Sequence, residues 1–264
     1  MLSGNRNDLG DWKRHVLAGL TPHLDRREFL KAALVGSAAL AGGGALAGRL
    51  AAGTGGKAVK TGTFYFPRLL FHVMDDTADI WNTYPMADVR LRSRLAQLTN
   101  INVSTEPVVV ELRNLERMCR YPFIFATSEG NFDIPPNEEK NLREFLMRGG
   151  FMHFDDCVVG HTGDRFFQAC VRLLRKFFPD HELKRVPDSH EIYHCYFDFP
   201  KGCPFLQGKD HGGWGLFEKG TGRIMTFVTP GDLHCGWTNS YFTPELNAAS
   251  IRMGINIIIY YLTH

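Results

Sequence analysis

The sequence lacks three short motifs that identify common nucleotide-binding enzymes and serine hydrolases. It has no Gly-x-Gly-x-x-Gly and no Gly-x-x-x-x-Gly-Lys-Ser/Thr, so neither a dinucleotide site nor a P-loop is indicated. It also has no Gly-x-Ser-x-Gly, the turn that exposes a serine nucleophile. These three kinds of site are therefore not indicated.

Charge is also scarce. The 264 residues carry a formal net charge of only +2. Residues 1–31 hold six Lys/Arg against four Asp/Glu, so the rest of the chain is neutral overall. Binding of nucleic acid needs a basic face, and a neutral domain gives no reason to expect one. We therefore expect no nucleic-acid partner. With 44% hydrophobic and 12% aromatic residues, the chain is long enough to bury one sizeable core.

Closely spaced cysteines are absent as well. None of the six cysteines shows Cys-x-x-Cys spacing, which argues against a zinc ribbon or a thioredoxin motif. None follows the apolar N-terminal run, which excludes a lipoprotein anchor. Cys195 and Cys203 are the nearest pair for a disulfide outside the cytoplasm, and buried free thiols fit the sequence equally well.

The N-terminal region carries the clearest targeting signal. The stretch "DRREFLK" precedes a weakly apolar Ala/Gly run, Ala32–Gly48, and resembles a twin-arginine export signal. The residues that carry the resemblance are Arg26, Arg27, Phe29 and Leu30. We expect residues 1–24 to be a cytoplasmic tail, 25–48 an apolar signal or retained transmembrane helix, 49–62 a linker and 63–264 the folded domain.

Two fates of the apolar run remain open. "ALA" at 45–47 suits cleavage, whereas Gly44 and Gly48 suit close packing on another membrane helix. A short Ala/Gly helix gains little in lipid alone, so retention would call for partner subunits. We expect a protein of the inner membrane with its main domain in the periplasm, other membrane subunits as partners, and no nucleic acid.

Beyond residue 62, apolar strand-like runs alternate with helical patterns. Strand-like runs fall at 63–71, 107–112, 121–130, 149–157 and 222–229, and helical patterns at 88–99, 135–150, 164–178 and 247–263. Asp88 would cap the first of these helices. This alternation predicts an α/β fold with a mostly parallel sheet and helices on both faces.

Polar clusters follow three of the predicted strands, where ligands bind in such sheets. Catalytic candidates are Asp155, Asp156, His190 and Asp232, and metal-ligand candidates are Asp155, His190, His194 and His234. No cofactor is predicted, although these side chains leave room for a divalent metal ion. The alternative is that the aspartates cap helices or bind loop amides and the histidines are ordinary loop residues.

The ordered motifs "YPFIFATSEGNF", "EEKNLREFLMRGGFMHFDDC", "VPDSHEIYH" and "GRIMTFVTPGDLHCGW" resemble the bacterial domain-of-unknown-function family four-one-five-nine, over roughly residues 63–263. The resemblance implies a three-layer, flavodoxin-like fold related to class I glutamine amidotransferases. The family usually has Thr-Gly-His-Gly where this chain has Thr127–Gly130.

In active amidotransferases, the strand after the glycine pair leads to a Gly-x-Cys-x-Gly turn. Here that position falls on Asp155 or Asp156, and Cys157 follows without flanking glycines. The resemblance therefore implies a degenerate nucleophile turn. The sequence supports two functions. The first is a non-catalytic, membrane-anchored periplasmic subunit of a larger assembly, for example a respiratory or photosynthetic complex. The alternative is a periplasmic hydrolase or a metal- or ligand-binding enzyme that uses the Asp and His residues at the strand ends.

Overall fold

A computed structural model describes residues 62–158 and 164–264 of the chain. The cytoplasmic tail, the export signal, the apolar helix and nearly all of the linker expected from the sequence lie outside these residues. No helix within the two described ranges combines the length and apolarity needed to cross a membrane.

Within residues 62–158 and 164–264, nine strands form two sheets. They are β1 (Thr63–Phe64), β2 (Pro67–Leu70), β3 (Asn102–Val103), β4 (Val108–Glu111), β5 (Phe123–Ser128), β6 (Phe151–Asp156), β7 (Glu182–Arg185), β8 (Trp214–Phe217) and β9 (Ile224–Thr229). The main sheet has the order β4-β2-β5-β6-β9-β8-β7, and β1 pairs with β3 separately. The first five strands of the main sheet are parallel, β8 runs antiparallel to β9, and β7 runs antiparallel to β8.

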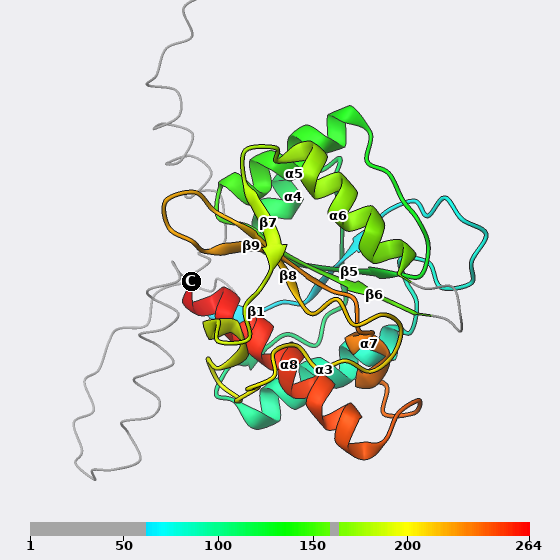
Figure 1. The fold of residues 1–264 in the computed structure, drawn as a ribbon, viewed down its shortest axis with the longest axis vertical. Helices are drawn as coiled ribbons and strands as arrows, with labels where there is room; N and C mark the ends of the chain where they lie inside the picture. The colour runs from blue at the N-terminus through cyan, green and yellow to red at the C-terminus, as the bar shows by residue number, and fades with distance from the viewer. Residues whose placement is uncertain (1–61, 159–163) are drawn as a thin grey trace, which may run out of the picture.

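Helices cover both faces of the sheet (Figure 1). They are α3 (Pro85–Leu98), α4 (Leu115–Arg120), α5 (Pro136–Met147), α6 (Arg165–Phe177), the 3-10 turn η1 (Glu191–Tyr193), α7 (Leu233–Trp237) and α8 (Pro244–Thr263). The helices α4, α5 and α6 lie on one face, and α3, α7 and α8 on the other. The predicted α/β fold with a mostly parallel sheet is confirmed.

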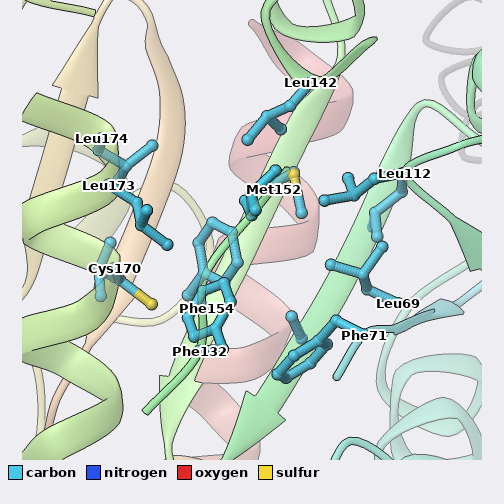
Figure 2. Close-up of a cluster of buried hydrophobic side chains, with 14 of the residues drawn as sticks. Leu69, Phe71, Leu112, Phe132, Leu142, Met152, Phe154, Cys170, Leu173 and Leu174 are labelled. Carbon is cyan, nitrogen blue, oxygen red and sulfur yellow. The ribbon is translucent and has the colours of Figure 1, made fainter. Parts of the chain in front are cut away.

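The sheet separates two apolar cores. One lies under α5 and α6, where Leu69, Met152 and Phe154 meet Leu142 and Leu173 (Figure 2). The other joins the opposite face to α3 and α8 and is rich in aromatic rings. Both faces of β5 and β6 are therefore buried, which is why these strands read as continuous apolar runs rather than alternating ones.

The structure corrects some of the sequence-based boundaries. The first long helix begins at Pro85, three residues before Asp88, so Asp88 lies in the first turn and does not cap it. The short helices α4 and α7 and the β7–β8 pair were not predicted, because each is too short to show a period. All six cysteines are free thiols, so Cys195 and Cys203 are not paired in a disulfide.

Candidate functional site

The point where the sheet reverses its direction of growth lies between β2 and β5, since β4 adds on one side of β2 and the later strands add on the other. Ligands of open parallel sheets bind at the carboxyl ends of the strands beside this point. Here the segment 71–84, which follows β2, covers it. The Asp79 carbonyl accepts hydrogen bonds from the Ser128 hydroxyl (2.9 Å) and the Glu129 amide (3.0 Å).

The same segment is pressed against the chain that follows β5. The Met74 amide donates to the Asn131 carbonyl at 2.8 Å. A Cβ added to Gly130 would lie only 2.3 Å from Val73 Cγ1, so no larger residue fits there without a shift. Residues 127–130 are buried as a result. The chain itself occupies the place where this topology usually holds a ligand.

Asp155, the catalytic candidate at the end of β6, is fully buried and bonded to the start of α7. Its carboxylate accepts hydrogen bonds from the amides of Leu233 (3.1 Å) and His234 (2.8 Å), and from the Thr229 hydroxyl. Burial, aided by the charge of Asp232, raises the pKa of Asp155 to about 8 despite these bonds. The geometry is that of a carboxyl group that holds a turn in place.

Asp156 points to the other face of the sheet. Its Oδ2 accepts a hydrogen bond from the Phe167 amide, in the first turn of α6, at 3.0 Å, and its Oδ1 has no partner among the described residues. Burial raises the pKa of this carboxyl well above its ordinary value. Among described residues, 155–158 contain no left-handed backbone, the strained conformation that exposes a nucleophile.

The left-handed residue lies instead at Asp232 (φ 60°), which caps α7 after β9. Its carboxylate accepts from the Cys235 amide (3.4 Å) and from the Gln207 side chain. Burial raises its pKa to about 6. The Cys157 and Cys235 sulfurs lie 3.6 Å apart, and one donor atom of each of Cys157, Asp232 and Cys235 lies within 4.8 Å of the others. A hydrogen bond with Cys235 and burial raise the pKa of the Cys157 thiol.

A buried ion pair supports α7 from the other side. Arg68 donates two hydrogen bonds to Asp88, at 2.9 and 2.6 Å, and one to the Thr83 carbonyl at 2.6 Å. Its Nη2 also lies 2.8 Å from His234 Nε2. Burial alone would raise the pKa of Asp88, but hydrogen bonding to His234 and the charge of Arg68 lower it. His234, a metal-ligand candidate, is thus committed to this network through Nε2.

The two other histidine candidates lie at the opposite edge of the sheet. The His190 ring packs on Phe217 and Tyr260, and it lines an open hollow of about 670 Å³ together with Arg223, the residue that precedes β9. His194 binds Asp198 at 2.5 Å and the Asp188 carbonyl at 2.9 Å. The structure therefore brings Asp155, Asp232 and His234 together and places His190 and His194 away from them.

The spacing His190-Glu191-x-x-His194 matches a zinc-protease motif, which sequence reasoning overlooked. That motif needs an α-helix, so that both histidines lie on one face. Here the residues between them form only the 3-10 turn η1, and the His190 ring nitrogen accepts from the Ile192 amide at 3.2 Å. In the described ranges, the two histidines belong to no cluster of converging metal ligands.

An exposed apolar surface lies over α3. We call it the α3 hollow; it measures about 650 Å³ and is lined by Tyr84, Pro85, Met86, Val89, Arg90, Ser93, Thr238, Ser240 and Tyr241. Met86 is 70% exposed and Tyr241 55%. A second hollow of about 360 Å³ continues from it, with Arg94 and Arg252 in its lining.

Four residues that the fold brings to the carboxyl edge of the sheet were not predicted as site residues from the sequence: Arg68, Asp79, Asp88 and Gln207. The one available signal was Arg68 itself, a charged residue inside an apolar strand, which is rarely buried without a partner. Asp79 and Gln207 lie in irregular segments and give no such signal.

Comparisons with known proteins agree with the motif order seen in the sequence. No curated protein matches the chain. The family model described as "Domain of unknown function (DUF4159)" matches residues 69–262, from β2 to the end of α8. The match covers well over half of the chain and includes both polar edges of the sheet. The chain therefore belongs to the DUF4159 family.

Proposed function

We propose that this protein is a non-catalytic subunit of a larger membrane assembly, held by its N-terminal segment with residues 63–264 in the periplasm. The domain would contribute structure or assembly rather than turnover. A respiratory or photosynthetic complex is one setting that fits an anchored periplasmic domain.

We infer that the fold is flavodoxin-like and related to the class I glutamine amidotransferases. In chain order, the five parallel strands of the sheet stand 2-1-3-4-5, which is the flavodoxin order. In that arrangement a catalytic centre would use the ends of β5 and β6.

The observation that carries the non-catalytic reading is the covered edge of the sheet. Segment 71–84 fills the ligand position through the Asp79 carbonyl. Both carboxylate oxygens of Asp155 accept hydrogen bonds from backbone amides, those of Leu233 and His234. A hydrolase, the alternative function, would need these side chains to reach substrate, yet Asp155, Asp232 and His234 are each 0% exposed.

The α3 hollow supports a protein partner. Exposed apolar patches rimmed by polar residues mark interaction sites, and Met86, Val89 and Tyr241 form such a patch. The neighbouring cations Arg90, Arg94 and Arg252 form no ion pair with any carboxylate in the described part of the chain. We propose that the hollow receives an apolar segment of another subunit, flanked by acidic residues that pair with these arginines.

The experiment compares two exposed methionines on opposite faces of the domain. Met86→Glu places a charge in the α3 hollow, whereas Met147→Glu places one on α5, at a site 52% exposed. Membranes containing the full-length tagged chain are solubilised in mild detergent, and the size and companions of the native complex are determined.

We expect the wild type and Met147→Glu to migrate in one large complex, and Met86→Glu to fold but lose its companions. Recovery of the wild type as a free monomer in the soluble fraction, with a new N-terminus near Gly48, would contradict the anchored subunit and favour the periplasmic enzyme. Equal retention of companions by both variants would show that the α3 hollow is not the docking surface.

A further inference from the structure

We propose that Cys157, Asp232 and Cys235 form a structural site for a thiolate-binding divalent ion of the Zn²⁺ class. This inference does not depend on the proposed function. Of its three ligands, only Asp232 is among the candidate residues named from the sequence, and the two cysteines replace the histidines. The site ties the end of β6 to the first turn of α7, two segments that are 78 positions apart in the chain.

The geometry suits a tetrahedral ion. Zn–S bonds of about 2.3 Å that meet at a tetrahedral angle span about 3.8 Å between sulfurs. The Cys157 and Cys235 sulfurs lie 3.6 Å apart, and an Asp232 oxygen lies within 4.8 Å of both. Small side-chain adjustments would bring all three donors to one ion.

The surroundings of the two thiols are polar, which is unusual for buried free cysteines. Cys170 shows the ordinary case, since it packs among Phe154, Leu173 and Leu174 in an apolar core (Figure 2). Cys157 and Cys235 instead face the Asp232 carboxylate. Two thiolates and a carboxylate form a donor set that favours Zn²⁺ over hard ions such as Mg²⁺.

The Asp232 carboxylate also lacks a cation. It is 0% exposed, and its partners in the described chain are the Gln207 side chain, backbone amides and the Cys235 thiol. Buried carboxylates are normally paired with a cation or bind a metal. No Lys or Arg in the described ranges forms an ion pair with Asp232, so a divalent ion would supply the missing positive charge.

A fourth ligand is at hand. Asp79 Oδ2 lies 3.8 Å from the Cys157 sulfur, in the segment 71–84 that covers this edge. Asp79 is half-buried, which leaves a route by which an ion can enter. Gln207 donates to both Asp232 and the Val158 carbonyl, and so orients the carboxylate as second-layer partners do in metal sites. Binding would release the two thiol protons to solvent for each ion bound.

The test uses the full-length chain purified with reductant and without chelator. We expect about one zinc per chain by elemental analysis. After removal of zinc, adding Co²⁺ alone should give the thiolate-to-cobalt charge-transfer band and the strong visible absorption of a tetrahedral site. The double variant Cys157→Ser/Cys235→Ser should hold less than about a tenth of the wild-type metal.

A matched control removes two cysteines elsewhere: Cys119→Ser/Cys203→Ser should keep wild-type metal content and cobalt spectrum. Asp232→Asn, which retains the shape of the side chain, should weaken zinc binding at least about tenfold in competition with a coloured chelator. If the double serine variant does not fold, the wild-type cobalt spectrum and the Asp232→Asn titration still decide the question.

Two results would overturn the proposal. One is wild-type protein that contains no zinc and gives no cobalt–thiolate band under reducing conditions. The other is a Cys157–Cys235 disulfide, found by mass spectrometry in protein isolated from cells without reductant, because a disulfide leaves no thiolate for a metal. Neither result bears on whether the protein has membrane partners.

Discussion

The two edges of the sheet use the same kinds of residue in opposite ways. At the carboxyl edge, Asp155, Asp232 and His234 are each 0% exposed. The two carboxylates accept hydrogen bonds from backbone amides, and the His234 ring lies against Arg68 and Asp88. At the amino edge, His190 and Arg223 line an open hollow of about 670 Å³. The carboxyl edge is where parallel sheets usually bind ligands, yet in this protein it is the closed one.

Position at a strand end therefore does not by itself make a ligand site. The carboxyl edge is closed because segment 71–84 and α7 both fold onto it and consume its hydrogen-bonding groups. In the described part of the chain, no segment covers the hollow at the amino edge in this way. We therefore expect substitutions at the carboxyl edge to lower the free energy of unfolding, and substitutions at the amino edge to change it little.

The largest effect is expected for Arg68→Met. It leaves the Asp88 carboxylate buried without its cation, so we expect the free energy of unfolding to fall by about 3–5 kcal/mol. Urea denaturation measures it. The double variant Arg68→Met/Asp88→Leu should recover much of this loss, because both charges are then gone. A single variant within about 1 kcal/mol of wild type would show that the pair is not needed.

A smaller effect is expected for Asp155→Ala. It leaves the amides of Leu233 and His234 without an acceptor in a buried place, which should lower the free energy of unfolding by about 1–3 kcal/mol. Thermal and urea denaturation measure it. Asp155→Asn keeps one acceptor and should lose less. A melt of Asp155→Ala that coincides with the wild type would contradict a structural role.

Asp164 tests the rim of the carboxyl edge through pH. Burial opposes its ionisation, but hydrogen bonds from Gln168, His211 and Lys209 lower its pKa to about 2. Since the folded pKa lies below the unfolded value of about 3.9, the stabilisation is present above that value and is lost as the pH falls toward about 2.

We therefore expect Asp164→Asn to cost about 1–2 kcal/mol at neutral pH, and the gap from wild type to narrow below about pH 4. Urea denaturation at several pH values measures both. The control Asp210→Asn changes a nearby exposed carboxylate and should show no such narrowing. A gap that stays constant down to about pH 3 would mean that the charge of Asp164 contributes nothing.

The smallest effect is expected at the amino edge. His190→Asn keeps an acceptor for the Ile192 amide and removes only ring contacts at a half-buried position, so we expect a change of about 1 kcal/mol or less. The same denaturation series measures it. A loss as large as that of Asp155→Ala would erase the contrast between the two edges.

Much of the fold was predictable because the signals are local. The helices α5, α6 and α8 follow apolar periodicity and capping residues within a single segment, and the strands β5 and β6 are continuous apolar runs. The short elements α4, α7, β7 and β8 were not predictable, since their stability comes from what they pack against. The rule of strand ends grouped Asp155, Asp232 and His190 as candidates; the structure brings Asp155 and Asp232 together, whereas His190 lies in a loop and packs on Phe217 and Tyr260.

The sequence alone determined the class of fold, the family and the location of polar groups at the ends of strands, because these depend on residue order and on periods of a few residues. Only the tertiary structure decided that these groups are closed off. Arg68 meets His234 across 166 positions, and Asp155 meets Leu233 across 78. Such contacts depend on how distant segments pack against each other. No local pattern of residues indicates whether a buried carboxylate will lie beside an amide, a cation or a pair of thiols.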